Sequence, residues 1–442
     1  MSDEQPPTSV SPMPERVCAL TERVCALTER MRALWWSCQD ADLPSWLPVS
    51  ATTQRTNQAA LDRMVTRAVD ESRTPPTSPQ QRLALQERSL AAFGEFAQST
   101  LGFQPRHLAL LSNGFMPALA AFSESARRFD PAIAGADILQ AGRNVSILNA
   151  LQHLLGMPVQ ITPAITAYSL LYPYTDNYLD DPAVSAADKA ALNQHLGQRL
   201  RGQPTAPTSE RERAILALVD MIETQYPRRD YPELFESLMA IHRAQERSVG
   251  LVRPRISPYE VDVLGISLEK GGTSVLADGY ITAGRLTPAQ EAFMFGWGAF
   301  LQLADDLQDV HTDAHDGVAT IFTLTARHRP LDGLCARTLA FGRHVLEPAP
   351  AIATPESTPL VELMQRSGDL LVQDAIGRAQ DLLSRDFVRR VERCFPFRFS
   401  ALSRARGQLA RQRVSFMREI EGYASAAQDH WQPPPTPYRS RQ

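Results

Sequence analysis

Four aspartates fall within nine positions at the end of the stretch "FLQLADDLQDVHTD", residues 300–313, and no Lys or Arg accompanies them. Asp305, Asp309 and Asp313 are spaced i, i+4, i+8, so on a helix they share one face with neighbouring Cβ atoms about 5–6 Å apart. Carboxylates this close repel one another and raise each other's pKa. Mg²⁺ relieves that repulsion, because it binds one or two carboxylates together with water and phosphate oxygens. The pattern therefore indicates either a metal-mediated diphosphate clamp or an ordinary solvated acidic helix end.

A second acidic cluster follows an apolar and aromatic run in "AYSLLYPYTDNYLDDP", residues 167–182. Asp176 and Asp180 are spaced i, i+4, and the Thr162–Pro163 pair upstream has the residue types that begin a helix. Pro173 removes one backbone N–H and is expected to kink this helix. We expect two such acidic faces, each at the end of an apolar helix, to converge on the mouth of one cavity.

The bulk composition excludes several other classes of protein. The chain has 442 residues, 43% of them hydrophobic, and a net charge of −4, so nothing global indicates a nucleic-acid partner or an anionic membrane surface. Its five cysteines show no CxxC spacing, which gives no zinc signature and fits a reducing compartment. The N-terminus lacks the pattern of a signal peptide, and no run of about 18 apolar residues predicts a transmembrane helix. We expect a cytoplasmic, soluble protein.

The chain divides into an extension, a helical domain and a tail. Residues 1–80 are predicted to be a partly disordered N-terminal extension that carries one amphipathic helix. In that helix the heptad "RVCALTE" occurs at 16–22 and again at 23–29. Its apolar stripe consists of Val17, Leu20, Val24, Leu27 and Met31. The helix either docks on a partner, caps the main body, or is a duplication tolerated on the surface.

Residues 81–430 are predicted to be almost wholly helical, and residues 431–442 to be a disordered tail. In "TSERERAILALVDMIETQYP", Ser209 is a predicted N-cap before a helical stripe of apolar residues. In "LTPAQEAFMFGWGAFLQLADDLQD", Thr287 is the predicted N-cap, with Pro288 at the first helical position and Gln290 completing a capping box. We expect this helix to run to about Asp313 and the fold class to be all-α.

The two acidic clusters resemble the Asp-rich motifs of trans-prenyl diphosphate synthases and class I terpene synthases. "GAFLQLADDLQD", residues 298–309, matches the prenyl-synthase pattern GxxxQxxDDxxD at every fixed position. "DNYLD", residues 176–180, resembles DDxxD with Asn177 in place of the second aspartate. "LEKGGTSVLADGY" resembles the Lys-Thr element that contacts diphosphate, with Lys270 as its lysine. The resemblance covers roughly residues 100–330.

The resemblance implies a class I isoprenoid synthase helical bundle around a central apolar cavity, which binds one prenyl diphosphate through a cluster of three Mg²⁺ ions. The implied metal ligands are Asp176, Asp180, Asp305, Asp309 and Asp313. Lys270, with Asp176, Asp180, Asp305 and Asp309, would carry the catalysis. The expected substrate-binding residues are Lys270, Arg243, Arg247, Tyr172, Trp297, Gly298 and Gln302. Related bundles often form dimers, but the sequence leaves the choice between a monomer and a homodimer open.

Departures from the chain-elongating pattern favour a cyclase. No Arg pair follows Asp181, and "AGRNVSI" offers Arg143 without the Lys of an isopentenyl diphosphate site. We therefore expect a Mg²⁺-dependent terpene synthase, a lyase that releases diphosphate and forms a terpene hydrocarbon or alcohol. Two alternatives stay open. One is a prenyltransferase, either chain-elongating or of the head-to-head squalene and phytoene type, and the other is a non-catalytic relative that binds a partner or a lipid.

Overall fold

The computed structural model describes residues 14–38, 43–73, 78–181, 183–252, 257 and 260–410. Within these residues the protein is helical and has no β-strand, apart from an isolated antiparallel bridge between Val252 and Val318. The predicted all-α class is therefore confirmed. The expected tail at 431–442, and the two ends of the chain at 1–13 and 411–430, lie outside the described residues.

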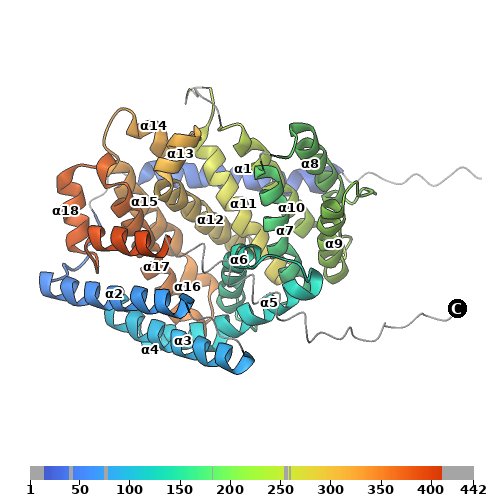
Figure 1. The fold of residues 1–442 in the computed structure, drawn as a ribbon. Helices are drawn as coiled ribbons and strands as arrows, with labels where there is room; N and C mark the ends of the chain where they lie inside the picture. Colours follow the sequence, from blue (N-terminus) through green and yellow to red (C-terminus); the bar gives the residue numbers. More distant parts are fainter. Residues whose placement is uncertain are drawn as a thin grey trace, which may run out of the picture.

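Eighteen α-helices are labelled along this described part of the chain (Figure 1). The first nine are α1 (Pro14–Ser37), α2 (Ala51–Arg73), α3 (Pro79–Leu101), α4 (Pro105–Leu110), α5 (Met116–Phe129), α6 (Gly135–Leu154), α7 (Pro163–Asp180), α8 (Ala186–Leu200) and α9 (Glu210–Gln225). The others are α10 (Pro232–Val249), α11 (Val263–Ala283), α12 (Pro288–Gln308), α13 (Val310–Asp316), α14 (Ile321–Ala326), α15 (Asp332–Leu346), α16 (Ala349–Ile352), α17 (Thr358–Arg378) and α18 (Arg385–Arg393).

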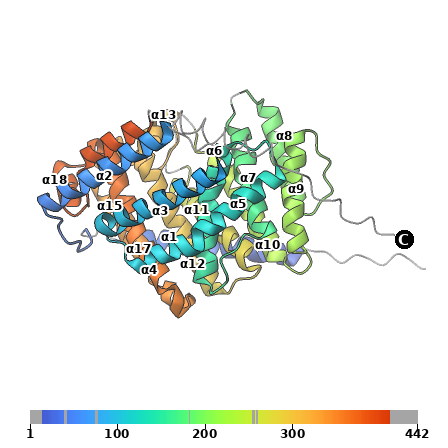
Figure 2. The ribbon, with the colours of Figure 1, turned by 60° about the horizontal axis from the view of Figure 1, so that its bottom comes forward.

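Helix α11 lies at the centre of the bundle and is surrounded by α1, α6, α7, α10 and α12 (Figures 1 and 2). Its sequence, "VLGISLEKGGTSVLADGYITA", is apolar or small around most of its circumference, and most of its residues are buried. A helix without a polar face is one that neighbours cover on all sides. The few polar side chains of α11 are therefore held inside the protein or at the edge of its interior.

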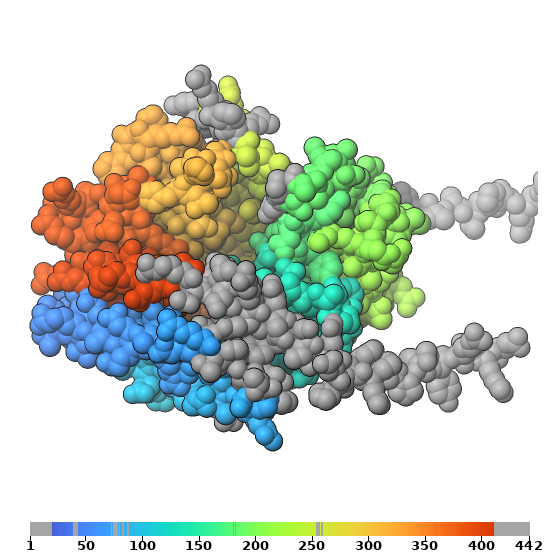
Figure 3. Space-filling model, in the orientation of Figure 1, coloured from blue at the N-terminus to red at the C-terminus, as the bar shows by residue number. Residues whose placement is uncertain are grey.

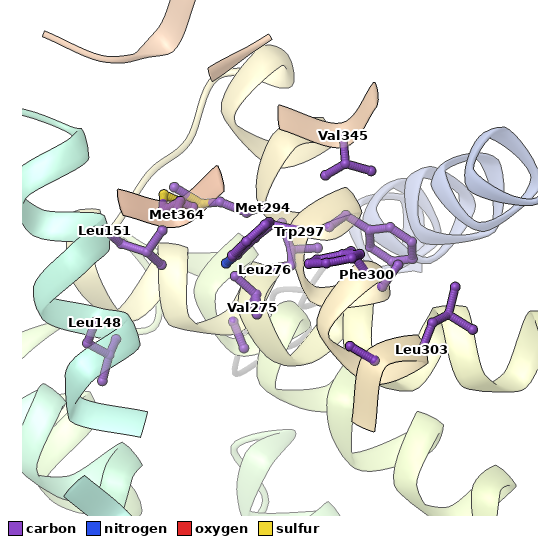
Figure 4. Packing of buried hydrophobic residues seen from close by; sticks show 14 of the residues in the cluster. Leu148, Leu151, Val275, Leu276, Met294, Trp297, Phe300, Leu303, Val345 and Met364 are labelled. Carbon is purple, nitrogen blue, oxygen red and sulfur yellow. The ribbon is translucent and has the colours of Figure 1, made fainter. Parts of the chain in front are cut away.

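Glycines let α11 and α12 cross at very short range. A Cβ atom added at Gly298 of α12 would overlap the backbone carbonyl of Gly271 on α11, and one added at Gly271 would overlap the carbonyl of Gly298. Around this crossing, Val275 and Leu276 of α11 pack with Met294, Trp297 and Phe300 of α12 (Figure 4). Because Lys270 adjoins Gly271, the crossing also brings Lys270 towards the acidic end of α12.

Helix α1 caps this central pair of helices. Its side chains at Leu20, Val24, Met31 and Trp35 are almost fully buried in the same core as α11 and α12, and Leu27 packs against that core. The predicted amphipathic helix is therefore observed, and of the roles open for it the structure shows the capping one. Helices α1 and α2 both add side chains to this core.

Polar contacts also fix α1 in place. The Arg23 guanidinium lies 3.3 Å from the Glu291 carboxylate of α12. The Tyr280 hydroxyl of α11 donates a hydrogen bond to the same carboxylate. This contact joins all three helices.

The predicted helix starts are confirmed at three positions. The side chains of Thr162, Ser209 and Thr287 each accept a hydrogen bond from the backbone N–H three residues later, and Gln290 completes the capping box at α12. Helix α12 ends at Gln308, however, and not near Asp313 as expected. Asp309 leaves the helical region with φ −100° and ψ 12°, and the separate helix α13 follows it.

Candidate functional site

The acidic residues at the end of α12 keep their common face despite the break in the helix. The Asp309 N–H donates to the Asp305 carbonyl at 2.9 Å, and the Asp313 N–H donates to the Asp309 carbonyl at 2.8 Å. These i to i−4 bonds are those of an α-helix, so the chain turns through Asp309 without losing its phase. Asp305, Asp309 and Asp313 therefore stand on successive turns, as the spacing predicts.

The electrostatic surroundings of this acidic face disfavour negative charge. Burial and the neighbouring Asp309 raise the pKa of Asp305. Burial, with the charges of Asp306, Asp309 and Asp305, raises the pKa of Asp313 to about 7. Without a bound cation, the carboxylates on this face are held close together at a cost in free energy.

Asp306 belongs to a different environment from the other three aspartates. Its side chain is buried and accepts a hydrogen bond of 2.8 Å from the Gln302 amide one turn earlier, and burial raises its pKa to about 6. Gln302, expected to bind substrate, thus supports Asp306 beside the α11–α12 crossing. The metal-facing stripe predicted from spacing excludes Asp306, and its burial agrees with that.

Two cations from other helices face the acidic stripe. The positive charge of Lys270 of α11 opposes the rise in the pKa of Asp305, Asp306 and Asp313. The charge of Arg143 of α6 does the same for Asp305. Neither side chain makes an ion pair within 4 Å with any residue that the structure describes. Both are therefore available to an anionic ligand at this place. The sequence identified Lys270, whereas Arg143 appeared there only as an incomplete second-substrate element.

A cavity of about 770 Å³ opens beside Arg143, between α6, α7, α8, α10 and α11. Figure 3 shows the face of the molecule that is hollowed between α13–α14, in orange, and α8, in green. The apolar lining residues are Ala136, Leu139, Ile147, Leu171, Leu196, Leu200, Leu238 and Ile241. The polar ones are Gln140, Arg143, Asn144, Tyr168, Tyr172, Thr175, His242, Gln245 and Ser274. Arg143 is thus both a wall residue of the cavity and a neighbour of the acidic stripe.

The first acidic motif lies at the end of α7, and two residues that precede it in this helix line the cavity. Tyr172 lines the cavity and is 48% exposed, and Thr175 lines it one turn later. The Thr175 hydroxyl lies 3.3 Å from the Asp176 carboxylate. Asn177 donates a hydrogen bond of 2.8 Å to Asp137 of α6. Asp180 is the last residue of α7, and its side chain lies outside the described part of the structure.

Trp297 and Gly298 do not line this cavity. Trp297 is 8% exposed, and its ring packs at 5.2 Å from that of Phe300 in the core (Figure 4). Gly298 occupies the close crossing with α11. Both were expected to contact substrate, since they precede the acidic cluster on the same helix. The structure gives them a packing role, because this part of α12 faces α11, α15 and α17.

Arg243 and Arg247 were expected to point inward, but in the structure their side chains contact groups outside the cavity wall. The Arg243 guanidinium lies 3.4 Å from the Thr21 hydroxyl of α1, and Arg247 forms an ion pair with Glu269 at the surface. The cavity-facing residues of α10 are Leu238, Ile241, His242 and Gln245. This i, i+3, i+4, i+7 set leaves positions 243 and 247 on other faces of the helix.

The donor set of the acidic stripe suits a hard cation. Among the described side chains, no three of His, Cys, Asp and Glu converge as a metal-binding group. Mg²⁺ does not need such a group, because water and substrate phosphates supply most of its ligands. The mutual repulsion of Asp305, Asp309 and Asp313 is the feature that a cation would relieve. The residues present therefore fit Mg²⁺ bound together with a diphosphate.

In comparisons with known proteins, no family model and no curated protein matches this chain. None of the helices in the described residues combines the length and the apolar content that a membrane span needs.

Proposed function

We propose that this protein is a Mg²⁺-dependent class I terpene synthase with the helical bundle of that family. It would ionise one prenyl diphosphate and release diphosphate, and form a terpene hydrocarbon or alcohol. One observation carries the proposal: the charges of Lys270 and Arg143, which form no ion pair with the described residues, act on the acidic stripe of α12–α13, and Arg143 also lines the cavity.

The site residues divide the work of ionisation. Mg²⁺ bound by Asp305, Asp309 and Asp313 would act as a Lewis acid on the leaving diphosphate. Lys270 and Arg143 would bind the diphosphate oxygens, and charge-assisted hydrogen bonds of this kind are the strong ones. Asp176, and Asp180 next to it in the motif, would complete the clamp from α7. These groups neutralise the charge that develops on the leaving group as the C–O bond breaks.

The cavity would protect the resulting cation. The apolar part of its wall would shield the cation from water, and its volume of about 770 Å³ is within the range of pockets that bind one small organic ligand. Tyr168 and Tyr172 line it and present π faces, each of which stabilises a desolvated cation by roughly 0.5–2 kcal/mol.

Incubation with geranyl, farnesyl and geranylgeranyl diphosphate in the presence of Mg²⁺ tests the proposal. We expect one of them to yield diphosphate and a hydrocarbon or alcohol detectable by mass spectrometry. Asp305→Asn should lower the rate of release by about 10²–10³-fold, whereas Asp316→Asn, which changes an exposed acid on α13, is the matched control and should retain it. Absence of release from every chain length would contradict the proposal and favour the non-catalytic alternative.

A prenyltransferase is the second candidate, and Arg143 favours it. This arginine lies in the segment that was compared with an isopentenyl diphosphate element, and its positive charge opposes the rise in the pKa of Asp305. If a product forms only when isopentenyl diphosphate is added, chain elongation is the reaction. If two identical allylic molecules condense, the protein is a head-to-head synthase.

A further inference from the structure

His242 of α10 lies between two separate spaces in the protein. It lines the cavity of about 770 Å³, and it also lines a second, polar pocket of about 510 Å³ between α8 and α10. Among the described residues it is the only one that belongs to both linings. The residue is buried, with 6% of its surface exposed. A single imidazole therefore separates the cavity from the polar pocket.

Helices α8 and α10 present different residues to the two spaces. Leu196 and Leu200 of α8 line the cavity, together with Leu238 and Ile241 of α10. The polar side chains around the second pocket are those of Asn193, Gln194, Gln198, Arg201, Gln203 and Glu246. Four of these six residues are exposed, so the polar pocket opens to solvent. Water can thus approach His242 from one side, whereas apolar side chains surround it on the other.

Gly197 of α8 makes room for this imidazole. A Cβ atom added at Gly197 would lie 3.1 Å from His242 Nε2. That distance is shorter than ordinary van der Waals contact, so a side chain at this position would push the imidazole aside. Glycine in the interior of a helix is unfavourable compared with alanine, and position 197 is inside α8. The imidazole is therefore held by a close contact and not by loose packing.

The surroundings of His242 keep its imidazole neutral. Burial lowers the pKa of His242 below its ordinary value, although the charge of Glu246 opposes that shift. The charges of Arg201 and Arg243 lower the pKa further. The Glu246 carboxylate lies 3.6 Å from His242 Nε2. A neutral imidazole can accept a proton, and the neighbouring carboxylate would stabilise the imidazolium that forms.

A packing role alone does not explain an imidazole at this position. A leucine or a phenylalanine would continue the apolar wall that Leu238 and Ile241 form, without the cost in free energy of burying a polar ring. The polar ring is explained if its two sides meet different partners. One partner is water in the polar pocket, and the other is the hydrocarbon part of a ligand in the cavity.

We propose that water enters the cavity from the polar pocket and captures the last carbocation, that His242 accepts the proton, and that the product is therefore a terpene alcohol. The inference rests on the proposed terpene synthase function and deepens it, since it chooses between the two classes of product. A lone pair of the water oxygen forms a C–O bond to the cation, which gives a protonated alcohol. The protonated alcohol transfers a proton to the unprotonated ring nitrogen of His242. The imidazolium then returns this proton to solvent through the polar pocket.

The test is a reaction of the full-length protein with its best prenyl diphosphate substrate and Mg²⁺ in H₂¹⁸O. We expect the wild type to form mainly an alcohol that carries ¹⁸O, as mass spectrometry would show. His242→Phe should release diphosphate at a rate within about twofold of the wild type. Its ratio of alcohol to hydrocarbon should fall about tenfold or more, because the cation then loses a proton and is not captured by water. His107→Phe should leave the ratio unchanged and is the matched control, because His107 is similarly buried, at 5% exposed, and lines neither space.

Each result either supports or overturns this role of His242. A wild-type product without ¹⁸O, or an unchanged ratio in His242→Phe, overturns it and leaves the proposed function in place. An equal loss of diphosphate release and of both products in His242→Phe would indicate a structural role and overturns it as well. Absence of diphosphate release from the wild type overturns the proposed function itself.

A second variant decides the question if His242→Phe fails to fold, as a thermal melt would show. Gly197→Ala keeps the imidazole but displaces it, because the added methyl group would lie 3.1 Å from Nε2. Alanine also favours the helix more than glycine does, so this variant should fold. We expect its ratio of alcohol to hydrocarbon to fall about threefold or more at an unchanged rate of diphosphate release. An unchanged ratio would overturn the inference.

Discussion

The two acidic helix ends differ in how their charges are balanced. At the end of α12, Asp305 and Asp313 have raised pKa values, because desolvation and the charges of neighbouring aspartates disfavour their ionised forms. At the end of α7, the motif has Asn177 in place of an acid, and its amide already donates to Asp137 of α6. Burial raises the pKa of Asp137, and the positive charge of Arg211, which lies over the ring of Tyr178, opposes that shift.

This difference indicates which end depends on a ligand. At the α7 end an amide and an arginine lie beside Asp137, whereas at the α12–α13 end several carboxylates lie near cations that form no ion pair with the described residues. A metal–diphosphate complex would supply positive charge to the carboxylates at the α12–α13 end more than to those at the α7 end. We therefore expect unequal contributions from the two motifs.

The largest effect should come from removing one charge at each end in turn. Asp305→Asn should lower the rate of diphosphate release by about 10²–10³-fold, the usual cost of losing a group that stabilises a developing charge. Asp176→Asn should cost about tenfold, since it leaves the denser cluster intact. Initial rates of diphosphate release at saturating Mg²⁺ measure both. Equal losses would show that the two motifs contribute alike.

The cations opposite the acidic stripe should matter next. Lys270→Gln and Arg143→Gln should each reduce kcat/KM by about 10–100-fold, because each removes a charge-assisted hydrogen bond to diphosphate. Arg247→Gln is the control, since Arg247 is exposed and paired with Glu269, and it should change kcat/KM by about twofold or less. A loss at Arg247 as large as at Lys270 would place the diphosphate elsewhere.

Local rules explain the parts of the fold that sequence predicts well. Thr162, Ser209 and Thr287 cap their helices with their own side chains, and that information lies within four residues of each position. The acidic stripe of α12 is likewise a matter of spacing along one chain segment. The break at Asp309 does not follow from such rules. The i to i−4 hydrogen bonds of a helix continue through it, and only the backbone angles of Asp309 depart from helical values.

Where the surroundings of a side chain differ from those expected from the sequence, contacts between distant segments of the chain determine them. Gly298 meets Gly271, which is 27 positions away in sequence, and neither glycine alone reveals the other. The direction of Arg243 depends on the rotation of α10 about its axis, set by its packing on α1 and α11.

Closing the space at the α11–α12 crossing should destabilise the fold. Gly298→Ala should lower the free energy of unfolding by about 1–3 kcal/mol, because its methyl group would overlap the Gly271 carbonyl. Gly407→Ala is the matched control in a helical segment, with no atom within 4 Å of the added methyl, and should be neutral or stabilising by about 0.5–1 kcal/mol. Urea denaturation measures both variants. An unchanged midpoint for Gly298→Ala would mean that the two helices separate easily.

The smallest effect should be a pH dependence of stability that metal removes. The pKa of Asp313 is about 7 in the folded protein, against about 3.9 for an unfolded aspartate, so between these values the folded state holds more protons. Stability of the metal-free protein should therefore fall as pH rises from about 4 to about 7 and level off above that. Asp313→Asn should recover about 1–2 kcal/mol at pH 8, a range that allows for solvent screening at a half-buried site.

The same measurement separates repulsion from a general effect of charge. Asp316→Asn, at the exposed end of the same helix, removes one charge outside the stripe and should leave the pH profile unchanged. Adding Mg²⁺ with diphosphate should flatten the wild-type profile, because the bound cation compensates the carboxylates that repel one another in its absence. A profile that keeps its slope with metal and diphosphate present would mean that the ligand does not bind at Asp313, and the acidic stripe would then have to be shortened to Asp305 and Asp309.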